Sequence, residues 1–188
     1  MPRPLREQVA GGIYHLVSRG VRKLPIFTDN RDRDRFLSLV DRTLQRYRWE
    51  LHAYCLMTNH FHLLVTTHEP NVSAGMQYLN GRYCQWFDWQ HGFEGHVVER
   101  RFWSQLMKSD PQLLTVGRYI VLNPVRAGLC RTASAWHWSS HCATAAASLE
   151  TLPVLSHWLL TLFDDDPQHA REHYAAFIHA GEQDMAQS

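Results

Sequence analysis

The segment Cys55-Leu56-Met57-Thr58-Asn59-His60-Phe61-His62-Leu63-Leu64-Val65-Thr66 decides the fold prediction for this chain. His60 and His62 stand at the head of an apolar, β-branched run, which predicts a β-strand. Alternate side chains of a strand share a face, so both imidazoles point to one side of a sheet, about 7 Å apart at the backbone. Phe61 then points to the other side, toward a core. Two imidazoles at this spacing can bind one ion, but two half-buried histidines with ordinary hydrogen bonds give the same pattern.

Strands and helices alternate on both sides of this segment. The expected elements are a central strand over 13–18, a helix from Asp29 or Asn30 to about 48, an alternating strand over 49–56, the histidine strand, a helix over 72–90, a strand over 100–108 and a helix over 111–123. The last helix is expected to stop before Pro124 because a residue that precedes proline avoids the helical region. Hairpin connections predominate, so we expect an α+β fold, a ferredoxin-like (RRM-like) antiparallel sheet with helices packed on one face.

The charge distribution separates a basic body from an acidic end. Residues 1–150 hold 18 Lys and Arg against 12 Asp and Glu, a net charge of +6, and residues 151–188 hold one Arg against six acids, a net charge of −5. We therefore expect a domain over 1–142 and an acidic, helical C-terminal tail over 143–188, with two short helices around 163–167. Arginine contacts phosphate through two parallel hydrogen bonds, so a basic body indicates a nucleic-acid partner, although a solvated basic surface would look the same. As a hypothesis, the tail folds over the basic body and competes with DNA.

Composition also indicates the cellular compartment in which the protein is expected. No apolar run approaches the roughly 20 residues of a membrane span, and the first eight residues lack the apolar segment of a secretory signal. The four cysteines have no CxxC spacing, so free thiols are expected rather than a zinc finger. These features predict a cytoplasmic protein without membrane contact.

Two residues of the helix over 111–123 supply further chemistry. Tyr119 and Asn123 are four residues apart and therefore lie on one helical face, one turn apart. If this helix packs across the histidine strand, Tyr119 brings a phenol nucleophile to the histidines and Asn123 brings an amide oxygen. Taken singly, Tyr119 fits a core aromatic residue and Asn123 fits a helix C-cap beside Pro124.

Several motifs together resemble the REP-associated tyrosine transposases, members of the single-tyrosine HUH transposases, over roughly residues 12–140. The matching segments are Gly12-Ile13-Tyr14-His15, Ile26-Phe27, Asp32-Arg33, His52-Ala53-Tyr54-Cys55-Leu56-Met57, Asn59-His60-Phe61-His62-Leu63-Leu64, Arg118-Tyr119-Ile120, Asn123-Pro124-Val125-Arg126-Ala127-Gly128-Leu129 and Trp138-Ser139-Ser140. The resemblance implies that 1–142 is the catalytic domain, with Tyr119 as catalytic tyrosine and His60 and His62 as metal ligands. Asn123 stands where relatives carry a polar ligand, often glutamine.

The implied activity is metal-dependent cleavage and rejoining of single-stranded DNA. Tyr119 would attack a phosphodiester to give a 5′-phosphotyrosine and a free 3′-OH, with Mg²⁺ or Mn²⁺ stabilising the developing charge. The implied substrate is a hairpin of a repetitive extragenic palindrome (REP), and we favour a monomer over a homodimer. Charge and neighbourhood suggest DNA contacts at Arg3, Arg6, Arg19, Arg22, Lys23, Arg100, Arg101 and Arg126.

Two other functions are compatible with these residues. A domesticated hairpin-binding protein would bind DNA without cutting it, although such a binder does not need His60, His62 and Tyr119 together. A metal-dependent hydrolase would cut DNA with water as the nucleophile and would form no covalent intermediate.

Overall fold

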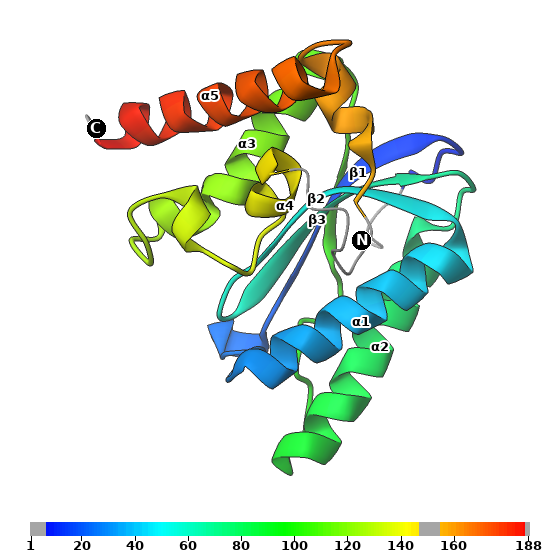
Figure 1. The fold of residues 1–188 in the computed structure, drawn as a ribbon. Helices are drawn as coiled ribbons and strands as arrows, with labels where there is room; N and C mark the ends of the chain where they lie inside the picture. Colours follow the sequence, from blue (N-terminus) through cyan, green and yellow to red (C-terminus); the bar gives the residue numbers. More distant parts are fainter. Residues whose placement is uncertain (1–6, 147–154, 187–188) are drawn as a thin grey trace, which may run out of the picture.

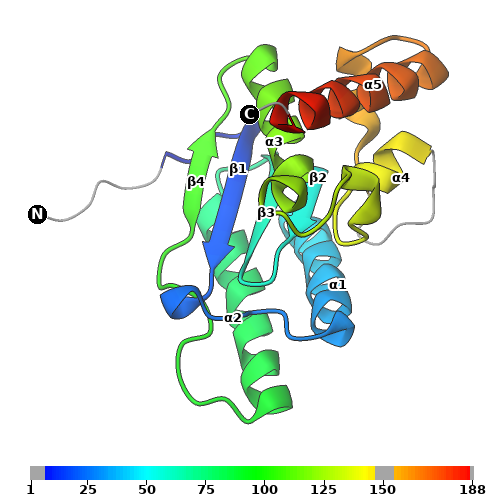
Figure 2. The ribbon, with the colours of Figure 1, turned by 90° about the vertical axis from the view of Figure 1, so that its left-hand side faces the viewer.

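An antiparallel sheet organises residues 7–146 and 155–186, the part of the chain that the computed structural model describes. Its four strands lie in the order β2-β3-β1-β4 (Figures 1 and 2). They are β1 (Gly12–Arg19), β2 (Trp49–Leu56), β3 (His60–Thr67) and β4 (Trp103–Leu106). With one helix after β1 and one after β3, this order is the ferredoxin-like topology, so the predicted fold is confirmed. The central position expected for β1 is also confirmed.

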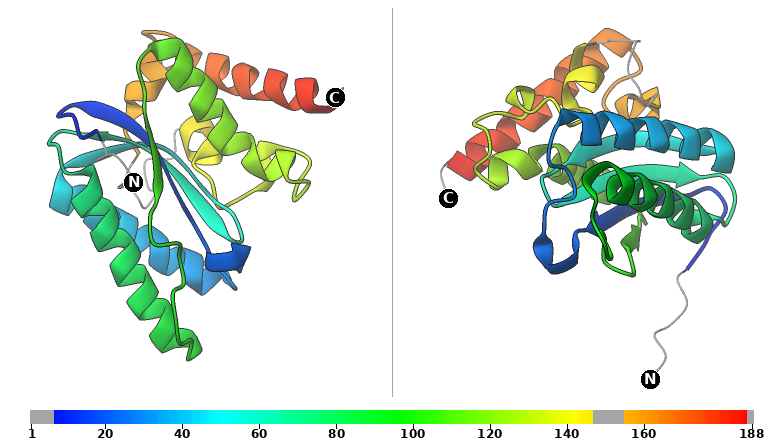
Figure 3. Two further views of the ribbon diagram at one scale, coloured as in Figure 1. Left: turned by 180° about the vertical axis from the view of Figure 1, so that it is seen from behind. Right: turned by 90° about the horizontal axis from the view of Figure 1, so that it is seen from below.

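Two helices cover one face of this sheet, α1 (Asn30–Tyr47) and α2 (Val72–His91) (Figure 3). Asp29 caps α1, since its side chain accepts a hydrogen bond from the backbone N–H of Asp32 at 2.9 Å. Phe61 packs on this side, with its ring centroid 4.4 Å from that of Phe36, which in turn lies 5.1 Å from Tyr83. The core that the alternation of β3 predicts therefore lies between the sheet and these helices.

A third helix, α3 (Asp110–Arg126), crosses the opposite face over β2 and β3. Its buried Leu113 and Ile120 pack with Cys55 and Leu64 of the sheet. The helix α3 thus covers the face of the sheet that carries His60 and His62, opposite the face that α1 and α2 cover. This is the packing on which a joint site of Tyr119 and the histidines depends.

The end of α3 corrects the sequence prediction. The helix continues through Pro124 to Arg126, and the backbone N–H of Ala127 still donates to the Asn123 carbonyl at 2.9 Å. Proline removes one helical donor, and here that loss falls in the last turn, where the chain tolerates it. Asn123 is therefore inside the helix rather than at its C-cap, and Arg126 joins the face of Tyr119 two turns later.

A β-bulge in β2 also departs from the expected simple alternation. The register with β3 shifts between Leu51 and Ala53, so His52 is the extra residue. Leu51 packs in the core under α1 and α2, whereas Ala53 packs under α3. Without the bulge these two residues would share a face, so the bulge turns the small side chains of Ala53 and Cys55 toward α3.

The C-terminal part has a helix on each side of 163–166, as expected, but the second of them is long rather than short. After α4 (His141–Ala146) and a 3₁₀ turn over His157–Leu162, α5 runs from Pro167 to Ala186. Gly181 of α5 packs against Leu122 and Arg118, whereas Tyr119 lies on another face of α3. The helix α5 thus packs on α3 away from the Tyr119 face, and the hypothesis that the tail competes with DNA stays a prediction. The division of the chain at residue 142 stays a prediction, and none of the helices described is both long and apolar enough to cross a bilayer.

The buried His52 predicts an acid-sensitive fold. Its ring bonds Thr66 Oγ1 at 2.7 Å, and burial lowers its pKa to about 4, below the 6.5 of an unfolded chain. The unfolded state therefore takes up the proton first, so this contribution to stability is complete above pH 6.5 and is lost as the pH falls toward 4. The slope is at most about 1.4 kcal/mol per pH unit. His52→Gln should flatten the pH dependence of urea unfolding over this range, with exposed His137→Gln as control, and equal slopes would contradict the assignment.

Candidate functional site

His60 and His62 project together from the face of β3 that α3 covers. Their ring centroids are 5.0 Å apart with the planes nearly perpendicular, which confirms that the two imidazoles share a face. His62 Nδ1 lies 2.9 Å from Nε2 of His15, and His60 Nδ1 lies 2.7 Å from Oδ1 of Asn59. In each ring the nitrogen nearer the backbone is thus held by a neighbour, which leaves Nε2 for another partner.

All three histidines of this cluster are held neutral at pH 7. Burial is the main cause and lowers the pKa of His15 and His60 to about 4 and that of His62 to about 2. The charge of Arg19 lowers the pKa of His60 and His62 further, whereas a hydrogen bond with the Asn123 side chain acts in the opposite direction on His60. A neutral imidazole keeps a lone pair, which is the form that binds a metal ion.

Tyr119 of α3 reaches this pair. Its ring meets His62 edge-on at a centroid distance of 5.7 Å and His15 at 6.2 Å. Tyr119 remains 36% exposed although its ring packs on the histidines. An open pocket of about 580 Å³ adjoins these three residues and is lined by β1, β4, α3 and the segment before β4.

The residues present fit a divalent ion. His62 Nε2 and Asn123 Nδ2 are buried, and neither has a hydrogen-bond partner among the described residues. Asn123 is 8% exposed and its side chain hydrogen-bonds His60, so an amide lies beside the histidine pair. Within residues 7–146 and 155–186, no three His, Cys, Asp or Glu side chains gather as a metal site. A third protein ligand at this pair would therefore be the Asn123 amide oxygen.

The predicted basic residues divide into three groups. Arg19 and Arg101 line the pocket beside Tyr119, and the Arg126 guanidinium lies 5.0 Å from the centroid of the Tyr119 ring. Arg22 and Lys23 belong to an exposed 3₁₀ turn that is hydrogen-bonded to Asn59. Arg100 lines a separate hollow against α2, and the predicted contacts Arg3 and Arg6 lie outside the described residues.

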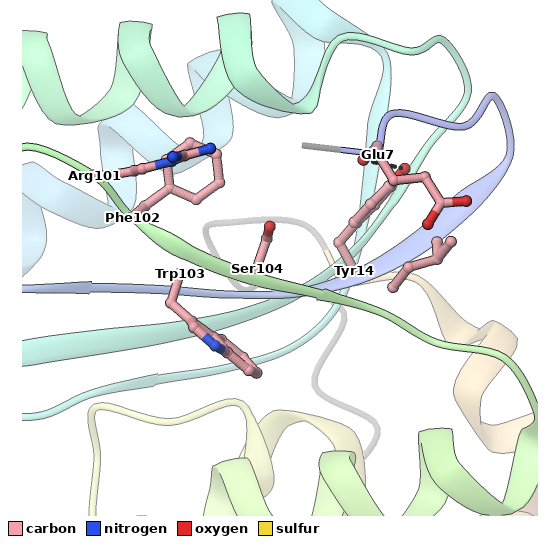
Figure 4. Close-up of a pocket in the computed structure, with 7 residues that line it drawn as sticks. Glu7, Tyr14, Arg101, Phe102, Trp103 and Ser104 are labelled. Atoms are coloured by element: carbon pink, nitrogen blue, oxygen red, sulfur yellow. Dashed lines mark hydrogen bonds between the residues drawn. The ribbon is translucent and has the colours of Figure 1, made fainter. Parts of the chain in front are cut away.

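One residue of the site, His15, was not predicted from the sequence, whereas Trp103 is among the tryptophans that the sequence offers for stacking on unpaired bases. His15 is 5% exposed and bonds His62, and the available signal was a histidine inside an otherwise apolar central strand. Trp103 of β4 lines the same pocket, is 50% exposed, and meets His15 edge-on at 5.1 Å. Figure 4 shows the Trp103 side chain on the opposite side of its strand from Ser104 and Phe102, which border a second hollow with Tyr14. The edge strand β4 therefore presents the exposed Trp103 indole on the side of the sheet that faces Tyr119.

Comparison with known proteins agrees with this geometry. The family model described as "Transposase IS200 like" matches residues 8–122, more than half of the chain. This chain belongs to that transposase family. It is 30% identical over 116 residues to a Haemophilus influenzae protein named "Putative REP-associated tyrosine transposase", and the match covers 56% of this chain and 66% of that relative, just under two thirds of its length.

A solved structure of a REP-associated tyrosine transposase bound to a REP hairpin shares the fold. The two superpose with a TM-score of 0.67 at 18% identity, over 83% of this chain and 92% of the other. The transposase family inferred from the sequence is thus confirmed, and both relatives carry the name REP-associated tyrosine transposase, one of them as putative. The family match includes His60, His62 and Tyr119, whereas Asn123 follows directly after its last residue and Arg126 lies four residues beyond it.

Proposed function

We propose that this transposase family member is a metal-dependent single-stranded DNA endonuclease and strand transferase that acts on REP-type hairpins through a 5′-phosphotyrosine. The observation that carries the proposal is the contact between Tyr119 and His62, which joins a partly exposed tyrosine to a pair of neutral imidazoles. The hairpin substrate is inferred from the relative whose solved structure holds a REP hairpin.

Tyr119 is the nucleophile in this proposal. Its oxygen attacks the phosphorus of a phosphodiester as the phenol loses its proton. The bond to the 3′ oxygen breaks, that oxygen takes up a proton to become a 3′-OH, and the DNA remains attached to Tyr119 through its 5′ phosphate. A 3′-OH from another strand can reverse the step, so cleavage becomes strand joining without an external energy source. The Arg126 guanidinium, 5.0 Å from the ring, is placed to pair with a phosphate that approaches the tyrosine.

His60, His62 and the amide oxygen of Asn123 are the proposed ligands of Mg²⁺ or Mn²⁺. When bound, such an ion neutralises negative charge on the phosphate oxygens during displacement. Two imidazoles favour Mn²⁺ over Mg²⁺ because Mg²⁺ prefers oxygen ligands. The burial that keeps both rings neutral prepares them for this role.

The pocket supplies the remaining contacts of the proposed DNA site. Arg19 and Arg101 line it and offer phosphate contacts, and the exposed indole of Trp103 offers a stacking surface for an unpaired base. Tyr119 meets His62 of its own chain, so one copy contains the whole constellation. This supports activity as a monomer.

A covalent adduct tests the proposal. Labelled single-stranded hairpin DNA incubated with the protein and Mn²⁺ should give a protein–DNA band that survives denaturing electrophoresis. Tyr119→Phe should abolish this band and leave hairpin binding within about twofold, because the ring contacts with His62 and Arg126 are kept. Removal of Mn²⁺ with a chelator should also abolish it.

The other outcomes identify the competing functions. Cut DNA without an adduct would indicate a hydrolase that uses water, and tight hairpin binding with neither product would indicate a non-cleaving binder. Either result in the unaltered protein would overturn the proposed mechanism.

The pocket arginines should contact DNA phosphates. Each phosphate contact contributes about one unit to the slope of log affinity against log salt, so Arg19→Gln and Arg101→Gln should each reduce that slope by about 1. Arg42→Gln on α1, exposed on the helical side of the sheet, is the matched control and should leave the slope unchanged. Equal slopes for all the proteins would place the DNA elsewhere.

A further inference from the structure

The side chain of His15 is bonded to the less accessible nitrogen of His62. His15 Nε2 lies 2.9 Å from His62 Nδ1, and the two rings stack at a centroid distance of 5.1 Å and an interplanar angle of 25°. His15 stands two residues before Val17, the register partner of His62, so the two imidazoles are diagonal neighbours on one face. Both are buried, with 5% and 4% of their surfaces exposed.

Asn59 makes the equivalent contact with His60, and here the direction of the hydrogen bond can be assigned. Asn59 Nδ2 donates to the backbone carbonyl of Lys23 at 3.0 Å, which fixes the orientation of the amide. The oxygen Oδ1 therefore faces His60 Nδ1 at 2.7 Å and can only accept. His60 Nδ1 therefore donates to Asn59, and Nε2 is the nitrogen of this ring that remains to face an ion.

The burial of Nε2 in His62 indicates that this ring, too, carries its proton on Nδ1. His62 Nε2 has no partner among the described residues and is shielded from water. A proton on Nε2 would leave a buried donor unsatisfied, which is unfavourable, whereas a lone pair there can bind a cation. The proton then lies on Nδ1 and is donated to His15 Nε2, which requires His15 to carry its own proton on Nδ1.

We propose that His15 and Asn59 are positioning residues that accept the Nδ1–H of His62 and His60 and so hold both rings in the tautomer that presents Nε2 to a divalent ion. This inference rests on the proposed function for the ion and adds two residues to the site. In this proposal neither residue is itself a metal ligand. Each acts through the ligand beside it, as outer partners of metal-bound histidines do.

Nitrogen NMR of the imidazole rings tests the tautomers without any metal. In metal-free protein labelled with ¹⁵N-histidine, His60 and His62 should both be the Nδ1–H tautomer at pH 7.5. His15→Phe keeps a ring of similar size without the acceptor, so His62 should lose that preference. His15→Gln supplies an amide oxygen near the same place and should restore it. An Nε2–H tautomer at His62 in the unaltered protein would overturn the proposal.

Calorimetric titration with Mn²⁺ gives the second measurement. His15→Phe and Asn59→Leu should each weaken Mn²⁺ binding about 10- to 100-fold, the usual effect of removing an outer partner, and His15→Gln should recover most of the loss. His141→Phe, which alters a buried histidine of α4 that bonds Tyr174, is the matched control and should bind Mn²⁺ as the unaltered protein does. Thermal melts of each variant separate a loss of fold from a loss of site.

The outcomes distinguish this inference from the function on which it rests. If the unaltered protein and His62→Ala bind Mn²⁺ equally, the histidine pair is not the metal site and the proposed function fails. If His62→Ala loses binding while folded His15→Phe and Asn59→Leu bind normally, the metal site stands and the positioning roles are refuted.

Discussion

The packing of α3 across the histidine face of the sheet is the contact on which the rest of the site depends. Leu113 and Ile120 of α3 are buried against Cys55 and Leu64 of the sheet. This packing places Tyr119 against His62 and excludes water from the rings around it. Desolvation then keeps the imidazoles neutral, so one apolar contact creates both the geometry and the protonation state of the site.

The helix α5 supports this arrangement from another side of α3. At Gly181 an added Cβ would lie 2.7 Å from a methyl of Leu122, so α5 packs too closely there for a larger residue. Near it the Arg118 guanidinium lies 4.4 Å from the centroid of the Phe177 ring. Residues 118 and 122 flank Tyr119 and Asn123 in sequence but occupy a neighbouring helical face. The acidic C-terminal part therefore contributes to the position of the tyrosine through α3.

Local periodicity accounts for what the sequence could predict. The two-residue spacing of His60 and His62 and the four-residue spacing of Tyr119 and Asn123 determine which side chains share a face, and both pairs lie as predicted. The contact between His15 and His62 depends instead on the register between β1 and β3, because these two residues are 47 apart in sequence. No local pattern specifies that register, so its bond to His62 was not predicted.

The remaining errors also arise where tertiary packing overrides a local rule. Both faces of β2 pack against apolar side chains. The bulge at His52 moves the residues that follow it to the other face of the strand, and an alternating sequence pattern gives no sign of such a shift. Pro124 stays helical because it lies in the last turn and is buried. That single turn brings the Arg126 guanidinium over the Tyr119 ring. The departure from the pre-proline rule therefore lengthens the helix and also adds a cation beside the tyrosine.

The basic turn after β1 and the histidine strand form one connected structure. Gly20 begins that turn, and an added Cβ there would lie 2.1 Å from the Leu24 carbonyl oxygen, so the chain can close this tightly only with glycine. Arg22 and Lys23 then adopt left-handed backbone angles, with φ values of 55° and 63°, which turn two exposed basic side chains outward. The Lys23 carbonyl accepts from Asn59, whose other amide atom faces His60. A contact that shifts the turn would therefore be felt at the His60 ring through one amide.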